Sequence, residues 1–345
     1  MRYSCLFAPL LLLLIAAFPA RSDAATCSPD VMAALHAPAA AGSRPVELDC
    51  DVTLSKRDVI KVPIAFSGSR ASGAVLDCNG ATLDGTVPKG RTVLIRSMQG
   101  RDGRWDVPQN IRIRNCTIKG DLRIQGMGGN GQAEKVKASS LQPGHLERAQ
   151  AAAPSRIILS NINFVANDVI PLYIAPGVTD VSVENSRFTG KVSSTVVYLD
   201  AESARNRIVG NTFDTDTSWR EVIAVDGSAD NLISRNTFLN PVKGGIFLYR
   251  NCGEGGAIRH QPPQHNIITD NDFRYKSLVA APAVWLGSRQ GISPYCIMRP
   301  TSSFGSGASP LDFAQYNKVT GNRLTGGLAT FILDSDKNNI VSNNK

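Results

Sequence analysis

An asparagine-centred phrase recurs along the chain, with apolar residues before and after each asparagine. Its copies are centred on Asn115, Asn161, Asn185, Asn211, Asn236, Asn271, Asn322 and Asn343. The successive asparagines at positions 161, 185, 211 and 236 lie 24, 26 and 25 residues apart. Repetition at a fixed period of this size is the signature of a solenoid.

Apolar residues alternate within the repeats, as in Ile111/Ile113 and Val181/Val183. A period of two is typical of a strand with one buried face. Units of about 25 residues holding short strands suit one turn of a parallel β-helix, in which equivalent residues of successive turns lie about 4.8 Å apart. We therefore expect an all-β fold, a parallel β-helix solenoid. Its asparagines would form a hydrogen-bonded ladder, or else mark turns.

The opening phrase at residues 75–85, VLDCNGATLDG, and the asparagine phrases resemble the right-handed parallel β-helix proteins of the pectate-lyase-like superfamily. The resemblance covers about residues 45–345 and implies a right-handed helix. Lyases, glycoside hydrolases, epimerases, esterases and tailspikes share that scaffold, so it does not select a reaction. The Asp-Pro-His-Asp phrase of alginate epimerases is absent, as are the Asn-Thr-Asp and Arg-Ile-Lys phrases of polygalacturonases.

The chain divides into a predicted signal peptide and one solenoid domain. Residues 1–24 combine Arg2, an apolar run and a small-residue cleavage site, which predicts export to a secreted or periplasmic location. Residues 25–345 form the β-helix domain, with a cap helix within residues 29–40 and insertions at about 121–154, 253–264 and 288–314. We expect no membrane span. The last turn lacks an evident cap, which suggests self-association.

The net charge is +8, and removing Arg2, Arg21 and Asp23 with the signal leaves 35 − 28 = +7. A basic exported protein attracts anionic partners such as uronate polysaccharides. Basic residues interleaved with aromatic ones are absent, so we expect no nucleic acid partner. Six cysteines remain after the signal, an even set that predicts disulfides, and repeat positions favour a pair between Cys252 and Cys296.

The second strand of each repeat predicts a binding face. One aliphatic column should point inward, so the flanking residues should point outward. The expected outer columns hold the aromatic residues Tyr173, Tyr198, Phe247 and Trp285, and beside them Asp200, Asp226, Tyr249 and Asp334. Sugar rings stack on aromatic faces, so these columns predict a carbohydrate groove, unless loops bury the rings.

Asp200 and Asp226 occupy the same position of adjacent repeats and should lie about 5 Å apart at the backbone. Such a pair could serve as acid and base or nucleophile in a glycoside hydrolase. It could hold Ca²⁺ against a uronate. It could also merely cap turns.

Basic and acidic residues follow the Asp pair in the next repeats. Arg250 would neutralise a substrate carboxylate, and Tyr249 or His260 would transfer the proton. Further substrate-binding candidates are Arg220, Glu254 and Arg289. The leading hypothesis is an enzyme that cleaves an acidic polysaccharide by β-elimination. The alternatives are a glycoside hydrolase that uses the Asp pair, and a β-helix that binds polysaccharide without catalysis.

Overall fold

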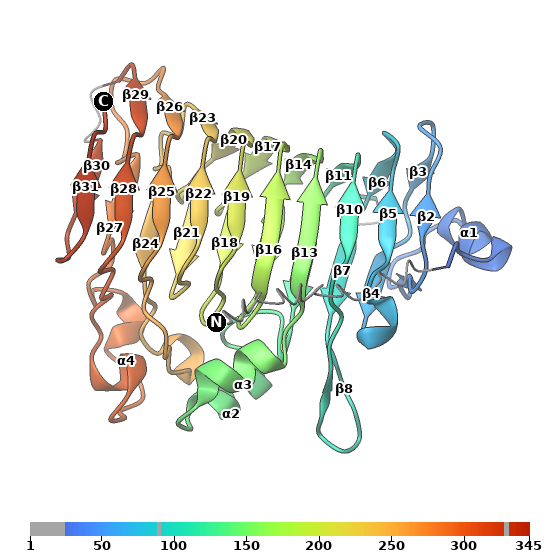
Figure 1. Ribbon diagram of the computed structural model, residues 1–345, viewed down its shortest axis with the longest axis horizontal. Coiled ribbons are helices and arrows are strands. Elements are labelled where there is room, and N and C mark those ends of the chain that lie inside the picture. Colours follow the sequence, from blue (N-terminus) through green and yellow to red (C-terminus); the bar gives the residue numbers. More distant parts are fainter. Residues whose placement is uncertain (1–24, 88–90, 328–330) are drawn as a thin grey trace, which may run out of the picture.

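The computed structural model describes residues 25–87, 91–327 and 331–345. The predicted signal peptide, residues 1–24, lies outside the described residues. Within them, three parallel sheets stack into a β-helix (Figure 1), which confirms the predicted fold. None of the helices in these ranges is long and apolar enough to cross a membrane.

Sheet I has ten strands in the described residues. They are β1 (Val46–Glu47), β4 (Ile64–Ser67), β7 (Val93–Arg96), β12 (Leu122–Gln125), β15 (Leu172–Ile174), β18 (Val197–Leu199), β21 (Ile223–Asp226), β24 (Ile246–Tyr249), β27 (Val284–Leu286) and β30 (Ile332–Asp334). Sheet II also has ten. They are β2 (Val52–Thr53), β5 (Val75–Asp77), β10 (Arg112–Arg114), β13 (Ser155–Ser160), β16 (Thr179–Glu184), β19 (Arg207–Val209), β22 (Leu232–Ser234), β25 (Ile267–Thr269), β28 (Lys318–Thr320) and β31 (Ile340–Ser342).

Sheet III has nine strands in the same ranges. They are β3 (Val59–Ile60), β6 (Thr82–Asp84), β11 (Thr117–Lys119), β14 (Asn163–Asn167), β17 (Arg187–Val192), β20 (Thr212–Thr217), β23 (Thr237–Leu239), β26 (Asp272–Arg274) and β29 (Arg323–Thr325). Inside it, Phe164, Phe188, Phe213, Phe238 and Phe273 stack with ring centroids 4.5–4.8 Å apart. Identical side chains stack because strand pairing repeats the same position in each turn.

The repeated asparagines fall into two adjacent columns. Asn115, Asn161 and Asn185 adopt the left-handed conformation of an exposed turn. Asn211, Asn236, Asn271 and Asn322 lie one position later and form a buried ladder, in which each backbone N–H donates to the next side-chain oxygen. The predicted single frame is therefore wrong by one residue for the first three copies. It is also wrong for Asn343, which is left-handed and directly precedes the ladder residue Asn344, while both predicted roles occur.

A second ladder was not predicted. It consists of Asn206, Asn231, Asn266, Asn317 and Asn339. These residues lie where sheet I turns into sheet II, outside the phrase that the sequence repeats most clearly.

Helix α1 (Pro29–Leu35) covers the first coil, as predicted (Figure 1). Ser28 caps its N-terminus, and Leu35 is fully buried against the core. At the other end of the solenoid, Ile340 and Val341 of β31 are exposed.

The insertions leave the solenoid along one side (Figure 1). The first insertion begins near residue 126 and not at 121 as predicted. Residues 122–125 belong to the solenoid, because they form strand β12 with Leu122 and Ile124 buried. The first insertion contains α2 (Glu134–Ser140) and α3 (His145–Ala151). The second contains the 3-10 turn η2 (Glu254–Gly256), and the third contains η3 (Pro294–Cys296) and α4 (Gly305–Ala308). The sequence did not predict the turn η1 (Ser69–Ala71) or the projecting hairpin of β8 (Met98–Gln99) and β9 (Trp105–Asp106).

Three disulfides join the described cysteines. Cys252 and Cys296, the pair favoured by the repeat positions, bond the second insertion to the third. The others are Cys27–Cys50 and Cys78–Cys116. Each disulfide closes a loop and so restricts the unfolded chain.

Candidate active site

Strand pairing aligns the outward side chains of sheet I in the predicted columns, except in the last coil. Tyr173 pairs with Tyr198, and Phe247 pairs with Trp285. Asp226 pairs with Tyr249 in the neighbouring column. The last coil is shifted, because Leu333 pairs with Trp285 and Asp334 with Leu286. Asp334 therefore does not belong to the carboxylate column, and the prediction that it does is wrong.

The carboxylates of this face are not exposed. Asp200 is 1% exposed and Asp226 is fully buried, because the first and second insertions lie on them. Tyr173 and Tyr198 stack at 5.0 Å, and their hydroxyls donate to Asp200 and Asp226 at 2.6 and 2.7 Å. The expectation that Asp200, Asp226 and Tyr173 face solvent is wrong, whereas Tyr198 is partly exposed. Repeat periodicity does not show where an insertion folds back.

Asp200 is surrounded by hydrogen-bond donors. Oδ2 accepts from the Gly131 N–H at 2.9 Å, and Oδ1 accepts from the Ala201 N–H at 2.8 Å. The buried Arg259 guanidinium lies 3.9 Å from Oδ1. Burial raises the pKa of Asp200 to about 6, and the nearby Asp226 charge acts in the same direction.

This donor set does not fit Ca²⁺. The ion requires several oxygen ligands, whereas the groups nearest Asp200 are N–H donors, a tyrosine hydroxyl and a guanidinium. No cluster of three metal-binding side chains occurs within the described residues. We therefore derive no step through calcium.

Asn251 links Asp226 to the edge of the buried cluster. Its backbone and side-chain N–H groups donate to Asp226 at 2.8 and 2.6 Å. Its side chain also donates to Glu254 at 3.1 Å and accepts from Arg289. Burial raises the pKa of Glu254, which stays partly exposed. A half-buried carboxylate of this kind is suited to take up a proton.

Two guanidinium groups flank Tyr249. The Arg289 guanidinium lies over the ring, 3.9 Å from its centroid. Arg220 donates to the Tyr249 hydroxyl and pairs with Glu221. Burial, together with the Glu221 charge, raises the pKa of Tyr249, so its hydroxyl keeps its proton. Both arginines are partly exposed, so an anion from solvent would meet them first.

Arg250, the predicted neutralising residue, contacts the third insertion instead. Its guanidinium donates to the carbonyls of Ser309 and Leu311 at 3.0 and 2.7 Å, and its backbone N–H donates to Asp312. The side chain is almost fully buried. Through these contacts Arg250 holds the third insertion in place.

His260 lies under the helices of the first insertion. Its Nε2 is 2.8 Å from the Ser140 carbonyl, and its ring contacts His145 edge-on. Burial lowers the pKa of His260. The structure therefore does not bring it into contact with Arg220, Tyr249 or Arg289.

Phe247 and Trp285 remain partly exposed, as does Tyr198, in contrast to the buried Tyr173. Their rings meet edge-to-face at 5.5 Å. A hollow of about 490 Å³ adjoins Arg289 and is lined by Ser288, Arg289, Ile292, Ser293, Pro294 and Tyr295. Aromatic faces and guanidinium groups are thus accessible in neighbouring coils.

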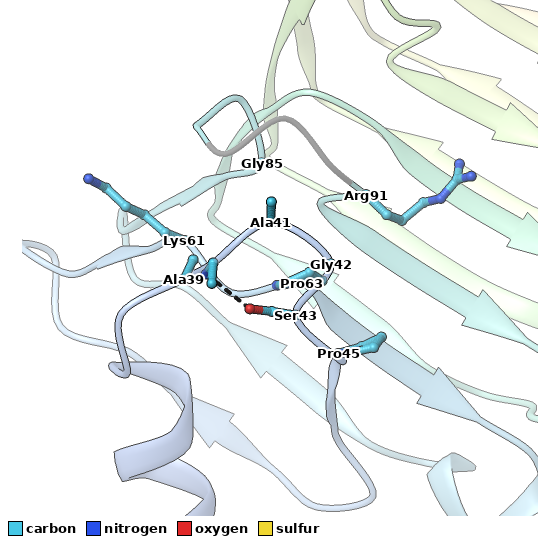
Figure 2. Close-up of a pocket in the computed structure, with 10 residues that line it drawn as sticks. Ala39, Ala41, Gly42, Ser43, Pro45, Lys61, Pro63, Gly85 and Arg91 are labelled. Atoms are coloured by element: carbon cyan, nitrogen blue, oxygen red, sulfur yellow. Dashed lines mark hydrogen bonds between the residues drawn. The ribbon is translucent and has the colours of Figure 1, made fainter.

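A second hollow, of about 300 Å³, lies near the N-terminal cap (Figure 2). Small residues form most of its lining, and a bond from the Ala40 N–H to Ser43 closes one of its turns. The described lining residues include no carboxylate or imidazole, so they offer no acid–base pair.

The sequence pattern does not predict Asn251 and Arg123 as members of the cluster, and it places Arg259 and Glu221 near the Asp pair without assigning them a role. Asn251 lies just before the second insertion and Arg259 lies within it, where no repeat period predicts their positions. Arg123 could have been found, because it extends the outer column to β12, where it lies over the Tyr173 ring.

The chain matches no protein-family model and no curated protein. Among solved structures, it is similar to the crystal structure of a mutant of the periplasmic alginate epimerase AlgG. The identity is 11% and the TM-score 0.31, over 83% of this chain and 77% of the other. The function must therefore be argued from the side chains of the site.

Proposed function

We propose that this chain binds an anionic, uronate-containing polysaccharide along the outer face of sheet I and cleaves it by β-elimination. The observation that carries the proposal is the pair of partly exposed guanidinium groups, Arg220 and Arg289, on either side of Tyr249. Guanidinium groups bind carboxylates through paired hydrogen bonds. Phe247 and Trp285, in the two coils beside them, offer faces for sugar rings.

The proposed reaction uses three kinds of group. The guanidiniums neutralise the uronate carboxylate, which acidifies the C–H next to it. Glu254 removes that proton, and the electron pair forms a C=C bond as the glycosidic C–O bond breaks. Glu254 then returns this proton to the departing oxygen, because Tyr249 is only 1% exposed and keeps its own proton. Asn251 positions Glu254 and Arg289, since it bonds to both.

The alternative of hydrolysis by the Asp pair needs both carboxyl groups to reach the sugar. Asp226 does not do so, since it is fully buried and accepts hydrogen bonds from Tyr198 and Asn251, so the pair would lack its second carboxylate. We therefore favour elimination. Three disulfides suit a secreted or periplasmic location, where an oxidising environment preserves them. Self-association through the last coil remains a prediction that sedimentation would test.

The test is a screen of purified protein against alginate, pectate and glycosaminoglycans, followed by ultraviolet absorbance of the new C=C bond. Glu254→Gln should abolish turnover but retain binding, and Arg289→Ala should weaken both. Arg187→Ala is the matched control, because it removes an equal charge from sheet III. Binding without absorbance in any arm would favour the non-catalytic alternative.

A further inference from the structure

The Gly-rich segment of residues 126–131, here called the strap, joins β12 to α2 and covers the Asp200 side of the outer face. The Gly131 N–H donates to Asp200, and the Gly131 carbonyl accepts from Arg259 Nη1 at 3.0 Å. The Gly129 carbonyl accepts from Arg123. Backbone groups of the strap thus serve as partners for three charged side chains.

Arg259 retains unused hydrogen-bonding capacity. It is only 1% exposed, yet its Nε and Nη2 atoms have no hydrogen-bond partner. Nη2 lies 3.9 Å from Asp200 Oδ1, which is beyond hydrogen-bond distance. The Nε–Nη2 edge is the fork that binds a carboxylate with two parallel bonds. Leaving such donors buried without partners is costly.

We propose that Arg259, Asp200 and Tyr173 form a second uronate subsite, and that the strap covers it in the ligand-free chain. The Arg259 fork would bind the carboxylate of one sugar unit, and Asp200 would bind a hydroxyl in place of the Gly131 N–H. The inference rests on the proposed substrate class. It adds that the strap must move aside when the polymer binds.

Gly131 is the position at which the strap can be displaced. A Cβ added there would overlap the Arg259 guanidinium, which is too buried to move away. A Cβ on Gly129 would meet only the ends of Gln125, at 3.1 Å, and Arg123, at 3.6 Å. Neither glycine has a positive φ, so alanine introduces no backbone strain at either position. Gly129→Ala is therefore a matched control within the same strap.

The experiment measures binding of a size-fractionated oligouronate by calorimetry, in a Glu254→Gln background that blocks turnover. Gly131→Ala should bind at least about tenfold more tightly than Gly129→Ala, because the ligand no longer has to break the strap's charged hydrogen bonds. Adding Arg259→Gln should remove the gain. In the Glu254→Gln protein itself, amide exchange of residues 126–133 should accelerate when the oligouronate binds.

Equal affinity of the two glycine variants, or slower exchange of the strap on binding, would overturn the subsite. If Arg289→Ala still weakens binding in that case, the proposed function survives without the second subsite. If the oligouronate binds to none of the proteins, the proposed function fails as well.

Discussion

Replacement of Asn236 by alanine should cost more than an asparagine side chain normally contributes. Asn236 Nδ2 donates to the Ile208 carbonyl at 2.8 Å, and its Oδ1 accepts from the Asn211 backbone N–H at 2.9 Å. Alanine leaves the buried Asn211 N–H without this partner and removes a second bond, the one to the Ile208 carbonyl. At about 1–3 kcal/mol for the orphaned N–H and about 0.5–1.5 kcal/mol for the lost bond to the carbonyl, the loss in unfolding free energy is about 3 kcal/mol. Whole domains are stable by only about 5–15 kcal/mol.

Urea unfolding under non-oxidising, non-reducing conditions measures this loss, provided that the slope m is unchanged. Asn167→Ala is the control, because Asn167 is exposed at the end of β14 and should change stability by no more than about 0.5 kcal/mol. A loss below about 1 kcal/mol for Asn236→Ala would refute the view that the ladder holds the coils together.

Two further predictions concern the buried carboxylates. The pKa of Asp200 rises from 3.8 to about 6, so the folded chain keeps a proton that the unfolded chain releases between these values. The resulting stability is complete below 3.8 and is lost as the pH rises to about 6, by up to about 3 kcal/mol. The difference in stability between wild type and Asp200→Asn should follow this curve, and a flat difference would contradict it. Because the donors around Asp200 do not fit calcium, EDTA should leave uronate turnover unchanged, whereas loss of activity restored by Ca²⁺ would show that a metal is required.

The fold was predictable because residues that recur in each repeat determine it. Phe188, Phe213 and Phe238 recur at one position, and each turn buries the same face. The asparagine frame was the weak point, since Asn185 and Asn211 look equivalent in the sequence although they occupy adjacent columns. Strand pairing resolves the two columns. The spacing of 26 residues between Asn185 and Asn211 follows from joining them, whereas Asn161 and Asn185 lie 24 residues apart within one column.

The site was predictable only where it belongs to the repeat. Tyr173, Tyr198 and Tyr249 fall in the predicted columns because strands fix them. The burial of Tyr173 and Tyr249 was not predictable, because it depends on how the insertions fold back. Gly131 reaches Asp200 across 69 residues, and no period in the sequence records that contact.

Mass spectrometry of the products from a uronate polymer tests the central claim most directly. Elimination at the site of Arg220, Tyr249 and Arg289 predicts a new non-reducing end that lacks one water, formed by wild type and Arg187→Ala but not by Glu254→Gln. Products that carry the added water would show hydrolysis and contradict the account, as would unsaturated products formed at the wild-type rate by Glu254→Gln.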